Sequence, residues 1–201
     1  TPSDFVVYQD LQVMTLTDID QNVYPIVKIN GLQYMGENLK TTRYSNGDLI
    51  PTTDIEYEVC LEEEPKYQWI YEAEEANLEV YGRLYTWYVV TDSRNVCPEG
   101  WHVPSEYEWV RLSDQLGGIL VAGAKLKEEG TAHWDASNNN ATNQTGFTAL
   151  PGGVWQCNGV CCCQGANANF WSSSEYIDWQ DRDFGYKRYL YYGSSYFFES
   201  H

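Results

Sequence analysis

Basic residues are scarce in this sequence, and their scarcity excludes several classes of function. The 201 residues hold 12 Lys and Arg against 29 Asp and Glu, for a formal net charge of −17. A nucleic-acid-binding surface needs clustered basic side chains to neutralise phosphates, and anionic lipid headgroups would repel so acidic a chain. The composition therefore predicts no nucleic-acid partner and no electrostatic attachment to a membrane.

Long apolar runs are also missing. The best run extends only from Ile119 to Ala124, whereas a membrane-spanning helix needs about 20 apolar residues. We therefore expect a protein that does not span a membrane. The chain starts at Thr1 without a charged-then-apolar signal segment, so any targeting peptide has been removed or was never present. A lipid anchor upstream of Thr1 stays open.

Familiar catalytic and metal-binding patterns are absent as well. There is no Gly-x-Ser-x-Gly elbow and no Asp-x-Asn-x-Asp-Gly calcium loop. The C-x3-C-C-C spacing of residues 157–163 matches no metal or redox motif. His133 has no nucleophile at a recognisable spacing, and His102 is expected to be a packed structural residue. We predict no enzymatic activity and no cofactor.

What is present indicates one folded domain. Hydrophobic residues make up 43% of the chain, which argues against disorder, and 201 residues are enough to bury a core. No linker is long enough to separate domains. We predict a single α+β domain over residues 1–201, with residues 1–17 as an N-terminal extension.

The first local signals are a hairpin and two helices. Residues 24–29 and 32–35 are strand-like and flank Asn30-Gly31, which favours a type I′ turn. Ser105 and Glu108 form a capping-box pattern, which predicts a helix that ends at residues 117–118. A second helix is predicted from the i, i+3, i+4, i+7 spacing of Tyr81, Leu84, Tyr85 and Tyr88. Beyond Gly123 we expect short strands and loops, without helical periodicity in the last fifty residues.

Residues 54–79 form an acidic segment, with ten Asp and Glu and one base, Lys66. Such a segment could attract calcium or repel partners. The favoured interpretation is a solvated loop and the polar surface of a helix.

Short motifs then occur in a distinctive order between residues 18 and 175. They include Gly36-Glu37-Asn38-Leu39-Lys40, Tyr81-Gly82-Arg83, Val96-Cys97-Pro98-Glu99-Gly100-Trp101-His102-Val103-Pro104, Gly146-Phe147-Thr148-Ala149-Leu150-Pro151-Gly152-Gly153 and Phe170-Trp171-Ser172-Ser173-Ser174. This order resembles the Fibrobacter succinogenes major paralogous domain, found in many exported bacterial surface proteins and lipoproteins. The resemblance implies a C-type-lectin-like fold of two helices and small antiparallel sheets, with a long irregular C-terminal ligand-binding surface. It also implies that Trp101 is a core aromatic residue.

The cysteines depart from the family pattern. The family usually carries a C-terminal Val-Arg-Cys-like motif whose Cys would pair with the position of Cys97, and this sequence has none. Six cysteines allow 15 pairings, among which the sequence does not choose. A fully paired scaffold is not expected, because three adjacent cysteines, Cys161 to Cys163, do not easily reach three separate partners.

Residues 150–201 follow a different residue pattern from the rest of the chain. Apparently fixed anchors such as Gly152-Gly153 alternate with exchangeable-looking positions, and unpaired thiols in a surface loop of an exported protein would oxidise. The segment resembles the variable regions that diversity-generating retroelements create by mutating adenines, because adjacent Asn codons then readily become Cys, Tyr or Ser codons. The candidate ligand-binding residues are Trp155, Gln156, Cys157, Cys161, Cys162, Cys163, Ile177, Trp179, Asp181, Tyr186, Tyr189, Tyr191, Tyr192 and Tyr196.

The sequence thus predicts a non-catalytic, ligand-binding protein on the bacterial cell surface or outside the cell. Its ligand is expected to be a protein or a glycan. Two alternatives remain: an ordinary surface adhesin or carbohydrate-binding lipoprotein domain, and an oxidase like the formylglycine-generating enzymes, which share the suspected fold and use a pair of cysteines with copper.

Overall fold

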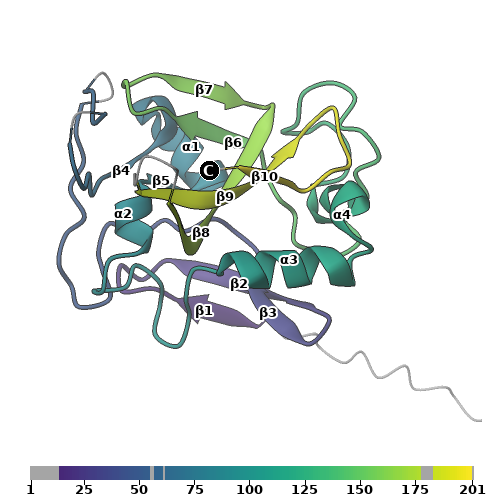
Figure 1. Ribbon diagram of the computed structural model, residues 1–201, viewed down its shortest axis with the longest axis horizontal. Helices are drawn as coiled ribbons and strands as arrows, with labels where there is room; N and C mark the ends of the chain where they lie inside the picture. Colours follow the sequence, from purple (N-terminus) through teal and green to yellow (C-terminus); the bar gives the residue numbers. More distant parts are fainter. Residues whose placement is uncertain (1–13, 55–56, 61, 178–182, 201) are drawn as a thin grey trace, which may run out of the picture.

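The computed structural model describes residues 14–54, 57–60, 62–177 and 183–200. In these residues the chain is a mixed α+β protein with small antiparallel sheets and four α-helices (Figure 1). The α+β class predicted from the sequence is therefore confirmed. Most of the predicted N-terminal extension and the candidates Trp179 and Asp181 lie outside the described residues.

The strands of the described residues form four sheets, ordered β1-β2-β3, β10-β9-β8, β4-β5 and β6-β7. Their bounds are β1 (Thr15–Thr17), β2 (Val23–Ile29), β3 (Leu32–Met35), β4 (Gln68–Trp69), β5 (Leu84–Tyr85), β6 (Gly152–Trp155), β7 (Cys161–Gln164), β8 (Asn167–Ile177), β9 (Asp183–Tyr191) and β10 (Phe198–Ser200). The helices are the 3-10 turn η1 (Tyr71–Ala73), α1 (Glu75–Tyr81), α2 (Trp87–Val90), α3 (Glu106–Gln115) and α4 (Ile119–Leu126).

The hairpin predicted at Asn30-Gly31 is confirmed. Strands β2 and β3 pair in antiparallel register, and Ile29 faces Leu32 next to the turn. Asn30 and Gly31 have φ of 48° and 86°, the left-handed values that a type I′ turn requires. The turn residues therefore fix the register of this hairpin.

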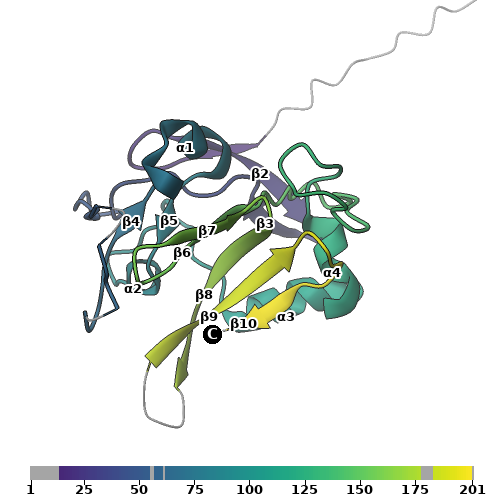
Figure 2. The ribbon, with the colours of Figure 1, turned by 90° about the horizontal axis from the view of Figure 1, so that it is seen from above.

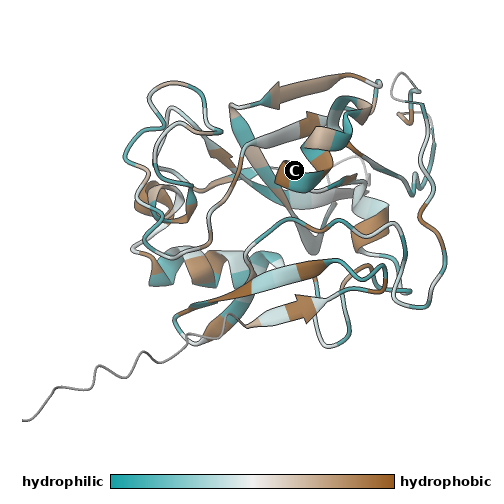
Figure 3. Ribbon diagram, turned by 180° about the vertical axis from the view of Figure 1, so that it is seen from behind, coloured by the Kyte–Doolittle hydropathy of each residue, from teal (hydrophilic) through white to brown (hydrophobic). Residues whose placement is uncertain are grey.

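The helix predicted after Ser105 is also confirmed. The Ser105 side chain accepts a hydrogen bond from the Glu108 amide, and the Glu108 carboxylate accepts one from the Ser105 amide. Polar and apolar residues alternate around α3 (Figure 3), and its inner side buries Trp109 and Leu112. The capping box and the apolar spacing together specify this helix.

The helix predicted from Tyr81 to Tyr88 is wrong. Helix α1 ends at Tyr81, because Gly82 adopts φ 69° and ψ −151°. Leu84 and Tyr85 then form β5, paired with β4, and α2 starts only at Trp87. Gly82 is required here because a Cβ would lie 2.8 Å from the Leu39 carbonyl oxygen. The helical spacing of the aromatic residues was therefore coincidental.

Helix α4 was not predicted, and its last turn lies beyond Gly123, where short strands and loops were expected. Its N-cap is Gly118, with φ 95° and no side-chain capping bond, so the usual start signal is lacking. Gly123 lies within the helix against the backbone of Tyr196, and a Cβ there would overlap the Tyr196 carbonyl. A tertiary contact explains this glycine better than a helix end does.

The larger hydrophobic cluster joins the helices to the C-terminal sheet. Trp109 and Leu112 from α3 belong to the same buried cluster as Leu190 of β9 and Phe197. Figure 2 shows α3 and α4 on one side of β8, β9 and β10, while the distal ends of β8 and β9 project beyond the other elements. The helices therefore support one end of the β8–β9 hairpin and leave the other end extended.

A buried cation fixes the turn after β9. Lys127 follows α4 and is completely buried. Its Nζ donates to the carbonyl oxygens of Ser194 at 2.9 Å and Tyr191 at 3.2 Å, and the carbonyls of Asn139 and Tyr192 lie at 3.4 Å. Burial lowers the pKa of Lys127 to about 8.

Candidate ligand-binding face

The sheet β8–β9–β10 has one buried face and one outward face. Ala168 and Leu190 are paired across β8 and β9, and their exposed fractions are 2% and 0%. One residue earlier on β9, Tyr189 pairs with Asn169 on one side and with Phe198 of β10 on the other. Since successive strand residues point to opposite faces, Tyr189 and Phe198 share the outward face. Their rings stack with centroids 4.7 Å apart.

Three further tyrosines extend this surface. Tyr196 is 42% exposed, and its ring centroid lies 5.4 Å from that of Phe198. Tyr191 is 37% exposed, and its ring centroid lies 4.4 Å from that of Tyr192. Tyr192 is partly buried and packs against the larger core cluster. We refer to Tyr189, Tyr191, Tyr192, Tyr196 and Phe198 as the tyrosine face. The structure thus brings four sequence candidates together and adds Phe198, which the sequence analysis had not singled out.

The buried face of the same strands carries an ion-pair network. Arg188, 2% exposed, contacts Glu106 at the start of α3 and lies 3.0 Å from Glu199 of β10. Burial lowers the pKa of Arg188. The two carboxylates compensate its charge, so this residue fixes the sheet to α3 and is not available to a ligand.

Trp155 of β6 is held by a buried tryptophan. Its ring stacks on Trp69 of β4, with centroids 3.9 Å apart and planes 13° from parallel. Trp69 is 3% exposed, and its Nε1 donates to the Thr53 hydroxyl at 3.0 Å. Half-buried Trp155 therefore packs on the buried Trp69 with one side of its ring and remains partly exposed. No sequence pattern indicated this contact, because the two residues are far apart in the chain.

A disulfide joins the acidic segment to the tip of the β6–β7 hairpin. Cys60 and Cys157 are bonded, with Cα atoms 4.9 Å apart. The amides of Val59 and Cys60 both donate to the Cys157 carbonyl, at 2.8 Å and 3.2 Å. The candidate Cys157 is thus a crosslink to the scaffold. Most described acidic side chains around it, such as Glu58 and Glu63, are exposed, in agreement with a solvated segment, whereas half-buried Glu62 accepts a hydrogen bond from the Tyr67 hydroxyl at 3.0 Å.

The remaining cysteines are only partly paired, as expected. Cys162 and Cys163 are bonded to each other within β7, and Cys161 is a free thiol. The exposed Gln156 side chain donates to Cys162 Sγ at 3.3 Å. Cys97 is also free, and burial raises its pKa to about 12. The β6–β7 hairpin therefore clusters six candidates, from Trp155 to Cys163, beside the tyrosine face.

Two candidates lie apart from these groups. A bulge interrupts the β8–β9 pairing between Trp171 and Glu175. Beyond it, Ile177 is 57% exposed and Tyr186 lies edge-on to Tyr176, with centroids 5.4 Å apart. These residues occupy the projecting end of the hairpin.

Two residues of the Cys-Pro-x-Gly-Trp-His run differ from expectation. His102 was expected to be packed, yet its side chain is 70% exposed. This expectation is wrong because the ring turns outward, where Nε2 lies 2.9 Å from Glu108 Oε1. Trp101 is only half-buried and packs at the margin of the smaller core cluster around Val89.

The family model of the Fibrobacter succinogenes major domain matches residues 27–197. The chain therefore belongs to this family, and the resemblance of its motifs to this domain is confirmed. The chain matches no curated protein and no solved structure. Among the described residues, no helix combines the length and apolar content of a membrane span. Nor do those residues contain a group of three or more His, Cys, Asp or Glu placed to hold a metal ion.

Proposed function

We propose that this protein is a non-catalytic, exported ligand-binding protein with a C-type-lectin-like fold, displayed on the bacterial surface. Residues from 150 onward act as a retroelement-diversified binding segment. One observation supports this most strongly: Tyr189 and Tyr191 point outward, while Arg188 and Leu190 beside them are buried. Outward positions can therefore change without altering the core.

The chemistry of the tyrosine face fits recognition. Tyrosine combines a large, rigid apolar area with a polar hydroxyl, which is why binding loops are rich in it. The acidic balance of the chain favours neutral or basic proteins, or uncharged sugars that stack on aromatic rings. The Cys60–Cys157 disulfide supports export, because disulfides persist mainly in oxidising compartments.

A binding assay tests the recognition role. The wild type, Tyr189→Ala and Tyr191→Ala would be compared in a pull-down and on a glycan array. We expect each variant to weaken binding by about 2 kcal/mol, as is typical of aromatic hot spots, while the melting temperature falls by no more than about 2–4 °C. Tyr107→Ala is the matched control, because Tyr107 is 74% exposed on α3, outside the C-terminal segment. Normal binding by both folded variants would refute the proposed face.

The flanking DNA tests the diversification role separately. A diversified protein has a nearby reverse-transcriptase gene and a near-copy template of the codons from residue 150 onward, differing only at adenines. An ordinary adhesin of the same family has neither. Absence of both elements would leave a ligand-binding protein whose segment is not diversified.

A further inference from the structure

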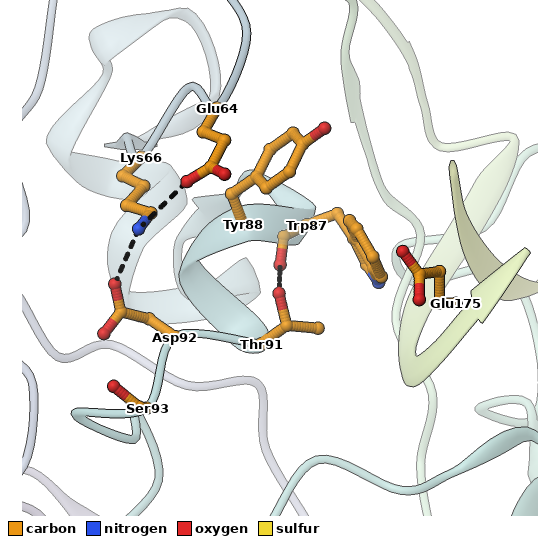
Figure 4. Close-up of a pocket in the computed structure, with 8 residues that line it drawn as sticks. All are labelled: Glu64, Lys66, Trp87, Tyr88, Thr91, Asp92, Ser93 and Glu175. Carbon is orange, nitrogen blue, oxygen red and sulfur yellow. Dashed lines mark hydrogen bonds and ion pairs between the residues drawn. The ribbon is translucent and has the colours of Figure 1, made fainter. Parts of the chain in front are cut away.

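A hollow of about 300 Å³ lies outside the tyrosine face, between α2 and β8 (Figure 4). Its lining residues are Glu64, Lys66, Trp87, Tyr88, Thr91, Asp92, Ser93 and Glu175. All except Glu175 precede residue 150. The hollow is therefore mainly a feature of the scaffold, and Glu175 is the one lining residue that the C-terminal segment contributes.

One wall of the hollow is a fixed aromatic ring. Trp87 Nε1 donates to the Ser172 carbonyl at 3.2 Å. Gly185 packs so closely against the five-membered ring of Trp87 that a Cβ at this position would overlap it. Tyr88 lies edge-on to Trp87, with ring centroids 5.3 Å apart. The indole is thus held from several sides and presents a preorganised surface.

The charges in the lining are unequally matched. Lys66 Nζ lies 3.1 Å from Asp92 Oδ2 and 3.5 Å from Glu64 Oε2. The hydrogen bond to Asp92 raises the pKa of Lys66, so its charge is committed to this pair. Within the described residues, nothing forms a hydrogen bond or ion pair with the Glu175 carboxylate, which lies beside the Trp87 ring (Figure 4). Among the described residues, Glu175 is therefore an anion without a counter-charge, next to an aromatic wall.

We propose that this hollow binds the guanidinium group of an arginine side chain on a partner protein. A guanidinium is planar, so it stacks on an aromatic ring while its N–H groups reach a carboxylate in the same plane. Trp87 supplies the ring and Glu175 supplies the carboxylate. The volume lies at the lower end of the roughly 300–1,000 Å³ of small-molecule pockets, which suits one side chain better than a whole ligand.

The charge of the whole molecule acts in the same direction. At a net −17, the protein attracts basic partners over distances longer than a single contact. A neutral sugar would also stack on Trp87 but would gain little from the Glu175 charge. The dependence on Glu175 therefore separates a guanidinium site from a sugar site.

An NMR titration tests the proposal with a small probe. The indole N–H signal of Trp87, one of eight tryptophans, is assigned by its loss in Trp87→Phe. The full-length protein is then titrated at low salt with N-acetyl-arginine methylamide, with its uncharged citrulline analogue, and with methyl glucoside. We expect a saturable shift of the Trp87 signal with the arginine probe, and at least about tenfold weaker binding of the citrulline probe.

Two matched variants locate the binding. Glu175→Gln removes the unpaired charge and should weaken the arginine probe about fivefold or more. Glu79→Gln removes the same charge from an exposed position on α1 and should leave the titration unchanged. Equal binding of arginine and citrulline, a Trp87 shift with the sugar alone, or no saturable shift would each overturn the proposal. The comparison of probes on the wild type keeps this test valid even if Glu175→Gln fails to fold.

Discussion

The inward and outward faces of the sheet β8–β9–β10 share the same strands, yet they are held in different ways. On the inward face, Leu190 is completely buried and Arg188 is paired with Glu106 and Glu199. On the outward face, the Tyr189 ring stacks on Phe198, another residue of the same surface. The comparison shows that one strand can carry a fixed set and a replaceable set of side chains at alternate positions.

The sharpest test of this comparison is a pair of neighbouring substitutions. Leu190→Ala should lower the free energy of unfolding by about 3–4 kcal/mol, because it leaves a cavity in the larger core cluster. Tyr189→Ala should cost about 1 kcal/mol, since it loses one ring stack on a partly exposed surface. Urea denaturation of both variants measures the difference. Equal losses would show that the outward face is also part of the core.

The disulfide between Cys60 and Cys157 gives the next largest expected effect. It joins residues 97 positions apart, and disulfides typically contribute about 2–4 kcal/mol, largely by restricting the unfolded chain. Cys60→Ser combined with Cys157→Ser should therefore lower the midpoint of urea denaturation. The vicinal Cys162–Cys163 bond remains in this variant and serves as the internal control. An unchanged midpoint would mean that the tip of the β6–β7 hairpin does not depend on the scaffold.

Asp92 tests the scaffold without touching either face of the sheet. Its carboxylate bonds to Arg94 at 2.8 Å and to Lys66 at 3.1 Å, and these bonds, that to Arg94 foremost, lower the pKa of Asp92 below 3.8. Asp92→Asn should cost about 2 kcal/mol at pH 6. A depressed pKa means that this stabilisation is complete above about pH 5 and is lost as the pH falls through the folded-state pKa. The gap between wild type and variant should therefore narrow toward pH 2, whereas a gap independent of pH would contradict the ion pair.

The smallest effect is expected in β7. Replacing Cys161, Cys162 and Cys163 together by serine should shift the melting temperature by less than about 5 °C, because surface substitutions contribute little. The Cys162–Cys163 bond links adjacent residues, so it restricts the unfolded chain hardly at all. Differential scanning calorimetry would measure the shift. A larger loss would place these residues among the structural ones.

Local chemistry explains which parts of the fold could be predicted. The Asn30-Gly31 turn and the Ser105 capping box are each specified by a few neighbouring residues. The hairpin and the helix predicted from them are both confirmed. Helix α4 has no such start signal, and a glycine is needed at position 123 because the backbone of Tyr196, distant in sequence, packs against it. Contacts of this kind are set by packing between segments far apart in the chain, so local patterns do not reveal them.

The same limit applies to the candidate face. Short strands were expected in this part of the chain, but only the register with β8 and β10 shows that Tyr189 is outward and Arg188 inward. The pairing of Cys60 with Cys157 and the stacking of Trp69 on Trp155 both cross long stretches of chain. Composition identified the aromatic segment, and the tertiary structure was needed to separate its outward-facing side chains from its buried ones.

Lys127 has a consequence for the conditions under which the turn after β9 keeps its shape. Its ammonium group gathers four carbonyl oxygens, much as a dissolved cation would do, but it is covalently tethered to the chain. Dilution or a chelator cannot remove such a cation. The positive charge is lost only when the Lys127 ammonium group gives up a proton, and its pKa of about 8 places this loss in mildly alkaline solution. The turn should therefore respond to alkalinity and remain indifferent to EDTA.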